Sequence, residues 1–139
     1  MRAVDRSFEV TVSVDQAWVF LSNVESWPQW AKHIKKVETN TPGEISLKTK
    51  GKFRLTNGIT TEFAMSEIHD QTNWKWQSHF LWLDIEFDHI FEKVNESSSR
   101  LQWTIDLSGP GASIIGLIFG KIYNRNLDTA IPNLQQAIQ

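Results

Sequence analysis

The stretch from Gly111 to Gln139 reads GASIIGLIFGKIYNRNLDTAIPNLQQAIQ. Large apolar residues recur in it at steps of three and four, which predicts one long amphipathic helix with a single apolar face. That face comprises Ile114, Ile115, Leu117, Ile118, Ile122, Leu127, Ile131, Leu134 and Ile138. Such a helix would be about 40 Å long, whereas a chain of this size has a radius of gyration of roughly 14 Å. We therefore expect it to span the whole domain and to lie across a sheet that encloses a space, with a kink or an interruption at Pro132.

The residues before this helix alternate between apolar and polar side chains, as strands do. The first alternating run is Ser7 to Val14, followed by two short helices, one with Asp15 as N-cap and one from Ser26 to Trp30. Further strands are expected at residues 33–39, 47–55, 60–68, 74–80, 83–94 and 100–107, with a type I′ turn at Asn57-Gly58. Since short turns join these strands, the sheet should be antiparallel. The sequence predicts one α+β domain over residues 1–139, with its helices on one face of the sheet.

Composition excludes several kinds of site and partner. There is no cysteine, so disulfides, thiolate nucleophiles and Cys-ligated metals are excluded. The net charge of −2 gives no general attraction to nucleic acid or to acidic membranes. No segment approaches the ~18 apolar residues of a membrane span, and Met1 to Arg6 lacks the apolar core of a secretory signal. We therefore expect a cytoplasmic location with no integral membrane segment and no nucleic-acid partner.

Parity along the strands predicts which side chains face the enclosed space. The expected ligand-binding cavity is lined by Phe63, Met65, Trp76, Ser78, Phe80, Phe87, His89, Trp103, Ile105, Ile118 and Ile122. Small-molecule sites generally combine apolar walls with a few polar groups, and here the polar groups are Ser78 and His89. His89 is either a core histidine satisfied by hydrogen bonds, a group that orients a ligand, or an acid or base, because its ordinary pKa is about 6.5. The four histidines match no zinc spacing, so we expect neither a metal nor a cofactor.

Several motifs resemble those of a known family. Val12-x-Val14-Asp15-x-Ala17-Trp18-x-Phe20-Leu21, followed by Val24-Glu25-x-Trp27-Pro28-x-Trp30, resembles the N-terminal signature of polyketide cyclase/dehydrase and lipid-transport type proteins. These belong to the START-like, or SRPBCC, superfamily with the birch-pollen-allergen-like helix-grip fold. The later segments that resemble the family are Asp88-His89-x-Phe91-Glu92, Leu101, Leu107-x-Gly109 and Leu127-x-x-Ala130-Ile131-x-x-Leu134.

The resemblance implies a curved antiparallel sheet of about six to seven strands that grips the C-terminal helix, with two short helices after the first strand. It also implies a hydrophobic cavity between sheet and helix. Members bind lipids, sterols, polyketides or plant hormones, and some catalyse cyclisation or dehydration. The superfamily has no shared catalytic set, so the resemblance assigns no catalytic residue here.

Three functions are consistent with the sequence. The first is binding of a small hydrophobic or aromatic ligand, lipid- or polyketide-like, by a monomer or homodimer. The second is a cyclase or dehydratase type of enzyme that uses His89 as acid or base. The third is a protein-interaction module whose contact surface is the basic region of Lys32, Lys35 and Lys36. Trp82 lies near an expected hairpin tip, where an apolar residue could form the rim of the cavity.

Overall fold

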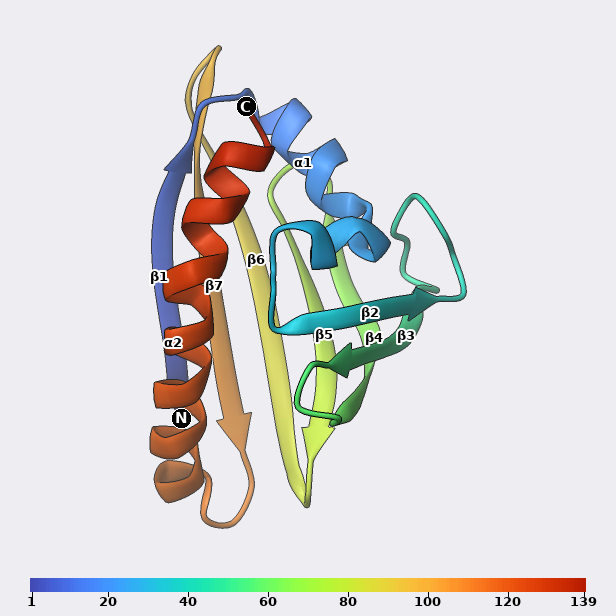
Figure 1. The fold of residues 1–139 in the computed structure, drawn as a ribbon, viewed down its shortest axis with the longest axis vertical. Helices are drawn as coiled ribbons and strands as arrows, with labels where there is room; N and C mark the ends of the chain where they lie inside the picture. Colours follow the sequence, from blue (N-terminus) through green and yellow to red (C-terminus); the bar gives the residue numbers. More distant parts are fainter.

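The computed structural model describes residues 1–139 and contains one seven-stranded sheet with helices on its inner side (Figure 1). The strands are β1 (Arg2–Val10), β2 (Ile34–Thr39), β3 (Lys50–Leu55), β4 (Thr60–His69), β5 (Asn73–Phe80), β6 (Leu83–Asn95) and β7 (Ser98–Ser108). The helices are α1 (Val14–Ser22), the 3-10 helix η1 (Val24–Gln29) and α2 (Ala112–Ala137). This confirms the predicted α+β fold, with two short helices after the first strand and one long helix at the end.

The sheet is antiparallel throughout, in the order β1-β7-β6-β5-β4-β3-β2. The first strand therefore pairs with the last, and Phe8 of β1 lies opposite Leu101 of β7. In Figure 1, β2 and β3 run across the direction of β5, β6 and β7, so the sheet curls into an open half-barrel. This is the curved sheet that the sequence predicts, and the helices lie on its concave side.

The start of the chain differs from the prediction. Pairing with β7 begins at Arg2, so β1 starts five residues before the alternating run at Ser7 and ends at Val10. The N-cap of α1 is Ser13 instead of Asp15. The Ser13 side chain accepts a hydrogen bond from the backbone N–H of Gln16, and the Gln16 side chain accepts one from the backbone N–H of Ser13. This capping box satisfies two donors at once, which leaves Asp15 within the first turn of the helix.

The β3–β4 hairpin forms as predicted but uses a different turn. A type I′ turn needs positive φ at both central residues, and only Gly58 has it, at 90°. The Asn57 side-chain oxygen instead accepts a hydrogen bond from the backbone N–H of Ile59. This local bond holds Asn57 in an ordinary conformation, so the predicted type I′ turn is wrong.

Helix α2 is continuous through Pro132, so the expected interruption does not occur. It packs against β1, and to a smaller extent against β7, through a row of small residues formed by Ala112, Gly116 and Gly120. A Cβ atom at Gly120 would collide with the backbone oxygen of Ala3, so glycine permits this close approach. No helix of the structure combines the length and apolarity that crossing a membrane requires.

The small-residue row determines where the large apolar residues of α2 point. The residues Ile114, Leu117, Ile118 and Ile122 are exposed, whereas Ile115, Phe119 and Tyr123 pack partly buried against the core. The prediction that all large apolar residues of this helix share one buried face is therefore wrong for its first half. The reason is that the helix contacts β1 through glycine and alanine, which turns the isoleucine row toward solvent.

The concave side of the sheet is filled by aromatic rings. The ring of Trp18 in α1 lies 4.9 Å from that of Trp74 in β5, between centroids. Trp27 in η1 lies 5.4 Å from Trp76 and 5.7 Å from His89. Trp82 is the one exposed tryptophan; the other six are buried. The aromatic residues that the sequence assigns to the inner face thus pack largely against one another.

Candidate ligand-binding site

A cavity of about 30 Å³ lies between the sheet, η1 and α2. It is lined by Trp27, Trp30, Ala31, His33, Ile34, Phe87, Asp88, His89, Trp103, Thr104, Ile105, Tyr123 and Leu127. This is room for roughly one water molecule, and it is far smaller than the roughly 300–1,000 Å³ of pockets that hold drug-sized ligands. The aromatic side chains around it therefore close most of the space that the curled sheet encloses.

His89 is the central polar group of this cavity. Its Nδ1 lies 3.3 Å from the backbone oxygen of Trp74, and a carbonyl oxygen can only accept. In the neutral ring Nδ1 therefore carries the proton, and Nε2 is an acceptor without a protein donor. Burial lowers the pKa of His89 to about 3, against the opposing effect of the bond to Trp74. The imidazole is neutral at pH 7 and holds no proton on Nε2 that it could donate as a general acid.

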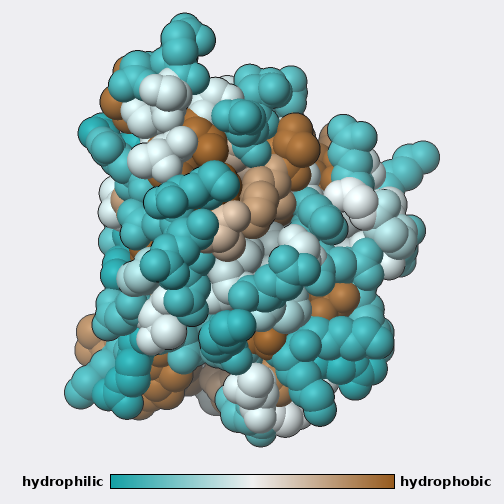
Figure 2. All heavy atoms as spheres, turned by 45° about the horizontal axis from the view of Figure 1, so that its top comes forward, coloured by the Kyte–Doolittle hydropathy of each residue, from teal (hydrophilic) through white to brown (hydrophobic).

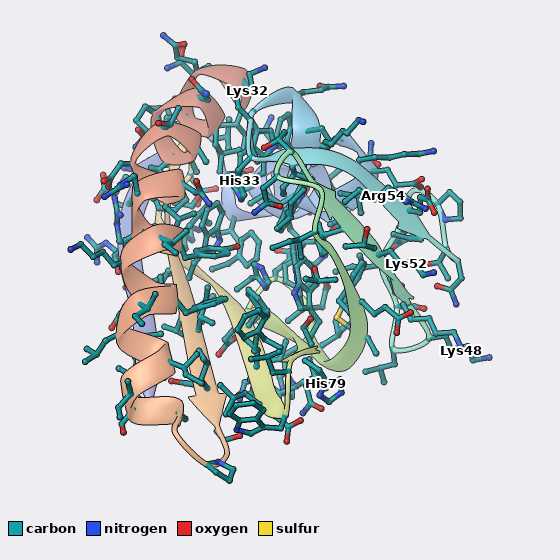
Figure 3. All side chains as sticks on the ribbon, turned by 60° about the horizontal axis from the view of Figure 1, so that its bottom comes forward. Lys32, His33, Lys48, Lys52, Arg54 and His79 are labelled. Atoms are coloured by element: carbon teal, nitrogen blue, oxygen red, sulfur yellow. The ribbon has the colours of Figure 1, made fainter.

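Tyr123 and His33 form the side of the cavity next to α2. The Tyr123 ring centroid lies 6.0 Å from that of His33 and 6.1 Å from that of Phe87, and the ring stacks on Phe119 at 5.6 Å. Burial raises the pKa of Tyr123 to about 12 and lowers the pKa of His33. Figure 3 shows His33 directed into the space between α2 and the sheet. His33, His89 and Tyr123 are thus uncharged at neutral pH; Asp88 is the fourth titratable group of the lining, and burial raises the pKa of its carboxyl.

Two further polar groups of the lining lack partners within the chain. The indole Nε1 of Trp30 is buried and has no hydrogen-bond partner. The Tyr123 hydroxyl forms no hydrogen bond with any protein group. Buried donors are almost always paired, so the cavity offers hydrogen-bonding capacity that the fold itself leaves unused.

The structure gathers only part of the predicted cavity lining. Phe87, His89, Trp103 and Ile105 line the cavity. Phe63, Met65, Trp76 and Ser78 are buried in the core beside it, and the Ser78 hydroxyl donates to the backbone oxygen of Glu62. Phe80, Ile118 and Ile122 are 36%, 61% and 59% exposed and lie outside the lining. Phe87, His89, Trp103 and Ile105 of β6 and β7 line the cavity as strand parity predicts, but Asp88 and Thr104, which parity assigns to the outer face, also line it. The rotation of α2 removes its two isoleucines from the lining.

Nine lining residues fell outside the set expected from the sequence: Trp27, Trp30, Ala31, His33, Ile34, Asp88, Thr104, Tyr123 and Leu127. The family resemblance suggests only a structural role for Trp27 and Trp30 in the helix pair. Their spacing of three residues is the relevant signal, because a 3-10 helix has three residues per turn and places both rings on one side. The signal for Tyr123 is its spacing of four residues from Phe119 and eight from Ile115, because these three residues form the inward row of α2.

The basic residues lie on other surfaces. Lys32 donates to the backbone oxygen of Gln29, and Lys36 lies 3.4 Å from a carboxylate oxygen of Glu38. Figure 3 shows Lys48, Lys52 and Arg54 on the side of the molecule away from α2. An open groove of about 630 Å³ runs there, lined by Glu38, Thr39, Asn40, Lys50, Gly51, Lys52, Glu62, Phe63, Ala64, Gln77 and His79. Its charges are mixed, and no group of three or more His, Asp or Glu side chains is arranged to hold a metal ion.

Comparison with known proteins identifies the fold. A family model described as "Polyketide cyclase / dehydrase and lipid transport" matches residues 1–139. A START superfamily protein from Mycobacterium smegmatis is 17% identical with a TM-score of 0.73, over 97% of this chain and 95% of that one. The XoxI protein from Bacillus cereus is 15% identical with a TM-score of 0.73, over 97% and 94%. The Zhui aromatase/cyclase from Streptomyces sp. R1128 is 12% identical with a TM-score of 0.65, over 97% and 89%. No curated protein matches this chain.

Proposed function

Because the chain belongs to the polyketide cyclase/dehydrase and lipid transport family, we propose that it binds a small apolar molecule bearing one hydroxyl group, in the space around His89. The observation that carries this proposal is the apolar lining of the site, in which no side chain carries a positive charge. Its walls are largely aromatic and aliphatic, His33, His89 and Tyr123 are uncharged at pH 7, and the one carboxyl of the lining, Asp88, already accepts a hydrogen bond from Asn73. Such a lining favours an apolar ligand, because an anionic one would lose its hydration without gaining an opposite charge.

The unused polar groups support the choice of a hydroxyl. A hydroxyl group both donates and accepts. It could donate to Nε2 of His89 and accept from Nε1 of Trp30, which has no partner in the chain. His89 would then orient the ligand as an acceptor and would not act as an acid. A single ordered water could satisfy the same two groups in the empty protein.

Ligand entry requires the cavity to expand, and Tyr123 is the best candidate for the side chain that moves. Its ring is held by stacking on Phe119 and by edge contacts to His33 and Phe87. Since its hydroxyl forms no hydrogen bond within the chain, rotating the ring breaks none. Rotation away from Phe87 would connect the cavity to the open side of the half-barrel.

Two measurements test this proposal. Native mass spectrometry of the purified chain should show an added mass of a few hundred daltons that is lost on denaturation. In urea unfolding, saturating naphthol should raise the midpoint, because a ligand that binds only the native state stabilises it. The shift should persist in His79→Gln, an exposed histidine away from the cavity, and should fall in His89→Phe. A bare native mass, together with no midpoint shift from naphthol or dodecanol, would refute the proposal.

A further inference from the structure

A group of exposed apolar side chains lies at the end of the molecule where α2 begins. We call it the apolar pole; its members are Leu81, Trp82, Ile114, Leu117 and Ile118, each between 61% and 68% exposed. Figure 2, which brings the opposite end of the molecule forward, shows hydrophobic atoms at the lower left edge and further hydrophobic patches near the top centre and on the right. Single exposed apolar residues are ordinary, but a contiguous group of this kind marks an interaction surface.

The two parts of the apolar pole are joined by a hydrogen bond. Trp82 lies at the tip of the β5–β6 hairpin, and its Nε1 donates to the backbone oxygen of Pro110 at 2.7 Å. Pro110 belongs to the loop that leads into α2, so the hairpin tip is fixed against the start of the helix. Figure 1 shows both segments at the same end of the fold. The indole face is left open to solvent while its polar atom is satisfied.

The backbone at the hairpin tip holds a leucine in a conformation that strains it. Leu81 has a φ of 56°, in the left-handed region that glycine adopts readily and leucine rarely does. A leucine that is 68% exposed contributes little to the core in return. Non-glycine residues in such conformations concentrate at functional sites. The side chain at this position is therefore better explained by an interaction outside the chain than by folding.

The charges that α2 carries next to the apolar pole have one sign, whereas on the hairpin side Asp84, two residues after Trp82, pairs with His79 at 2.8 Å. From Ala112 to Leu127, α2 carries Lys121 and Arg125 and no acidic residue. Ile114, Ile118, Lys121 and Arg125 follow one another at steps of three and four, so they share one helix face. With a rise of 1.5 Å per residue, Lys121 and Arg125 stand about 10 Å and 16 Å along the helix from Ile114. This face is therefore apolar at its tip and basic about two to three turns beyond Ile114.

We propose that the apolar pole docks the chain on the surface of a lipid bilayer that contains anionic headgroups. Apolar protein surfaces at the interface are buried about 5–10 Å deep. If the start of α2 enters end-on to that depth, Lys121 lies at the level of the lipid phosphates. Tryptophan prefers that same interface, and each Lys or Arg near an anionic surface adds to the attraction. The net charge of the chain is negative, so the attraction is local to this pole. The docking does not depend on the proposed ligand site.

A second copy of the chain fits this surface less well. A two-fold contact centred on the exposed face of α2 would bring Lys121 and Arg125 of both copies together. No acidic residue between Ala112 and Leu127 is available to compensate them. Like charges facing each other at an interface oppose association, whereas phosphates of lipid headgroups complement them.

Vesicle flotation and tryptophan fluorescence test the docking. The full chain should float with vesicles of phosphatidylcholine and phosphatidylglycerol, and binding should weaken on pure phosphatidylcholine and in high salt. Because Trp82 is the one exposed tryptophan, binding should shift its emission to the blue and protect it from iodide. Trp82→Phe should lose this spectral change. Chain that stays with the soluble fraction on both kinds of vesicle would refute the proposal.

Matched variants separate docking from folding. Leu81→Gly and Ile118→Ser should each lower the partition coefficient about tenfold, the loss expected for one large apolar side chain. Val19→Ser removes an exposed valine from α1 and should bind as the wild type does. Lys121→Gln with Arg125→Gln should remove the preference for phosphatidylglycerol. Equal losses in Val19→Ser, or a concentration-dependent dimer that Ile118→Ser dissociates, would overturn the assignment to lipid.

Discussion

The imidazole of His89 stacks on the indole of Trp74, with ring centroids 5.1 Å apart and planes at 26°. The two residues are direct cross-strand partners in β5 and β6, and the backbone oxygen of Trp74 also receives the His89 hydrogen bond. One residue thus buries the histidine and fixes its tautomer. The protonation state of His89 is consequently coupled to the stability of the sheet.

This coupling predicts an acid-sensitive fold. The pKa of His89 is about 3 in the folded chain and 6.5 as the ordinary value. Between these values the unfolded chain binds the extra proton, so stability should fall as the pH drops below about 6.5, by up to ~1.4 kcal/mol per pH unit. His33, whose pKa is also lowered, acts in the same direction. Urea midpoints measured from about pH 7 to about pH 4 would record the slope.

Replacing His89 measures its contribution to the pH dependence of stability. His89→Gln should reduce the slope of stability against pH below 6.5, although it lowers the stability at neutral pH through lost packing. His79→Gln, the same replacement at an exposed position on β5, is the matched control variant. If the wild type and His89→Gln lose stability in parallel, the acid sensitivity comes from other groups, such as His33 or carboxylates, and not from His89.

The close approach of α2 to β1 predicts opposite results for two neighbouring glycines. Gly120→Ala should destabilise the fold by about 1–3 kcal/mol, because its Cβ collides with the fixed backbone oxygen of Ala3. At Gly116 the obstacle is the end of the flexible Met1 side chain, which can move aside. Gly116→Ala should therefore be neutral, or stabilising by up to ~1 kcal/mol from helix propensity. Thermal unfolding of the two variants would show the contrast, and equal melting temperatures would contradict it.

Leu81→Gly should not destabilise the chain, although it removes a large apolar side chain. Relief of the left-handed conformation is worth roughly 1–2 kcal/mol, against about 0.5–1 kcal/mol for the added freedom of glycine. The other non-glycine residue with positive φ is Gln71, whose side chain donates a hydrogen bond to Asp15. Gln71→Gly loses this bond, so it should raise the free energy of unfolding less than Leu81→Gly does. Chemical denaturation of both variants measures the difference. A clear loss of stability in Leu81→Gly would mean that the side chain supports the hairpin.

The capping box makes Ser13 the residue on which the start of α1 depends. Ser13→Ala should cost about 1 kcal/mol, the usual loss for an N-cap, because the backbone N–H of Gln16 loses its acceptor. Asp15→Asn keeps an acceptor for Gln71 and removes only a charge near the helix N-terminus, which is worth about 0.3–1 kcal/mol. In urea unfolding, Ser13→Ala should have a lower free energy of unfolding than Asp15→Asn. The reverse order would indicate that Asp15 is the N-cap.

Local patterns were sufficient to predict most of the fold. The alternation that ends in His89 and Phe91 identifies the inner face of β6, because neighbouring residues of a strand point to opposite sides. The three- and four-residue steps identify α2 in the same way. Prediction fails where a contact outside the local pattern decides the structure. Ser13, and not Asp15, is the N-cap of α1 because its side chain bonds to Gln16. Pairing with β7 makes β1 begin at Arg2, before the alternating run.

The candidate site could be predicted only in part. Periodicity shows that α2 has an apolar face, but not that Gly116 and Gly120 form its contact with β1 and turn Ile118 outward. Nor does it show how much of the enclosed space Trp27 and Trp30 fill. Both results depend on the distance between elements far apart in the sequence, and that distance is set by backbone contacts such as Gly120 with Ala3.

The pairing of β1 with β7 also determines when the fold can be completed during translation. β1 is an edge strand whose one partner in the sheet is β7, and its ion pair between Arg2 and Asp106 spans 104 residues. At about 5–20 residues per second, the ribosome completes that partner roughly 5 to 20 s after β1. For this interval Val4, Phe8 and Val10 have no strand to pair with. The nascent chain thus leaves β1 open to aggregation during this interval, and slower translation prolongs that exposure.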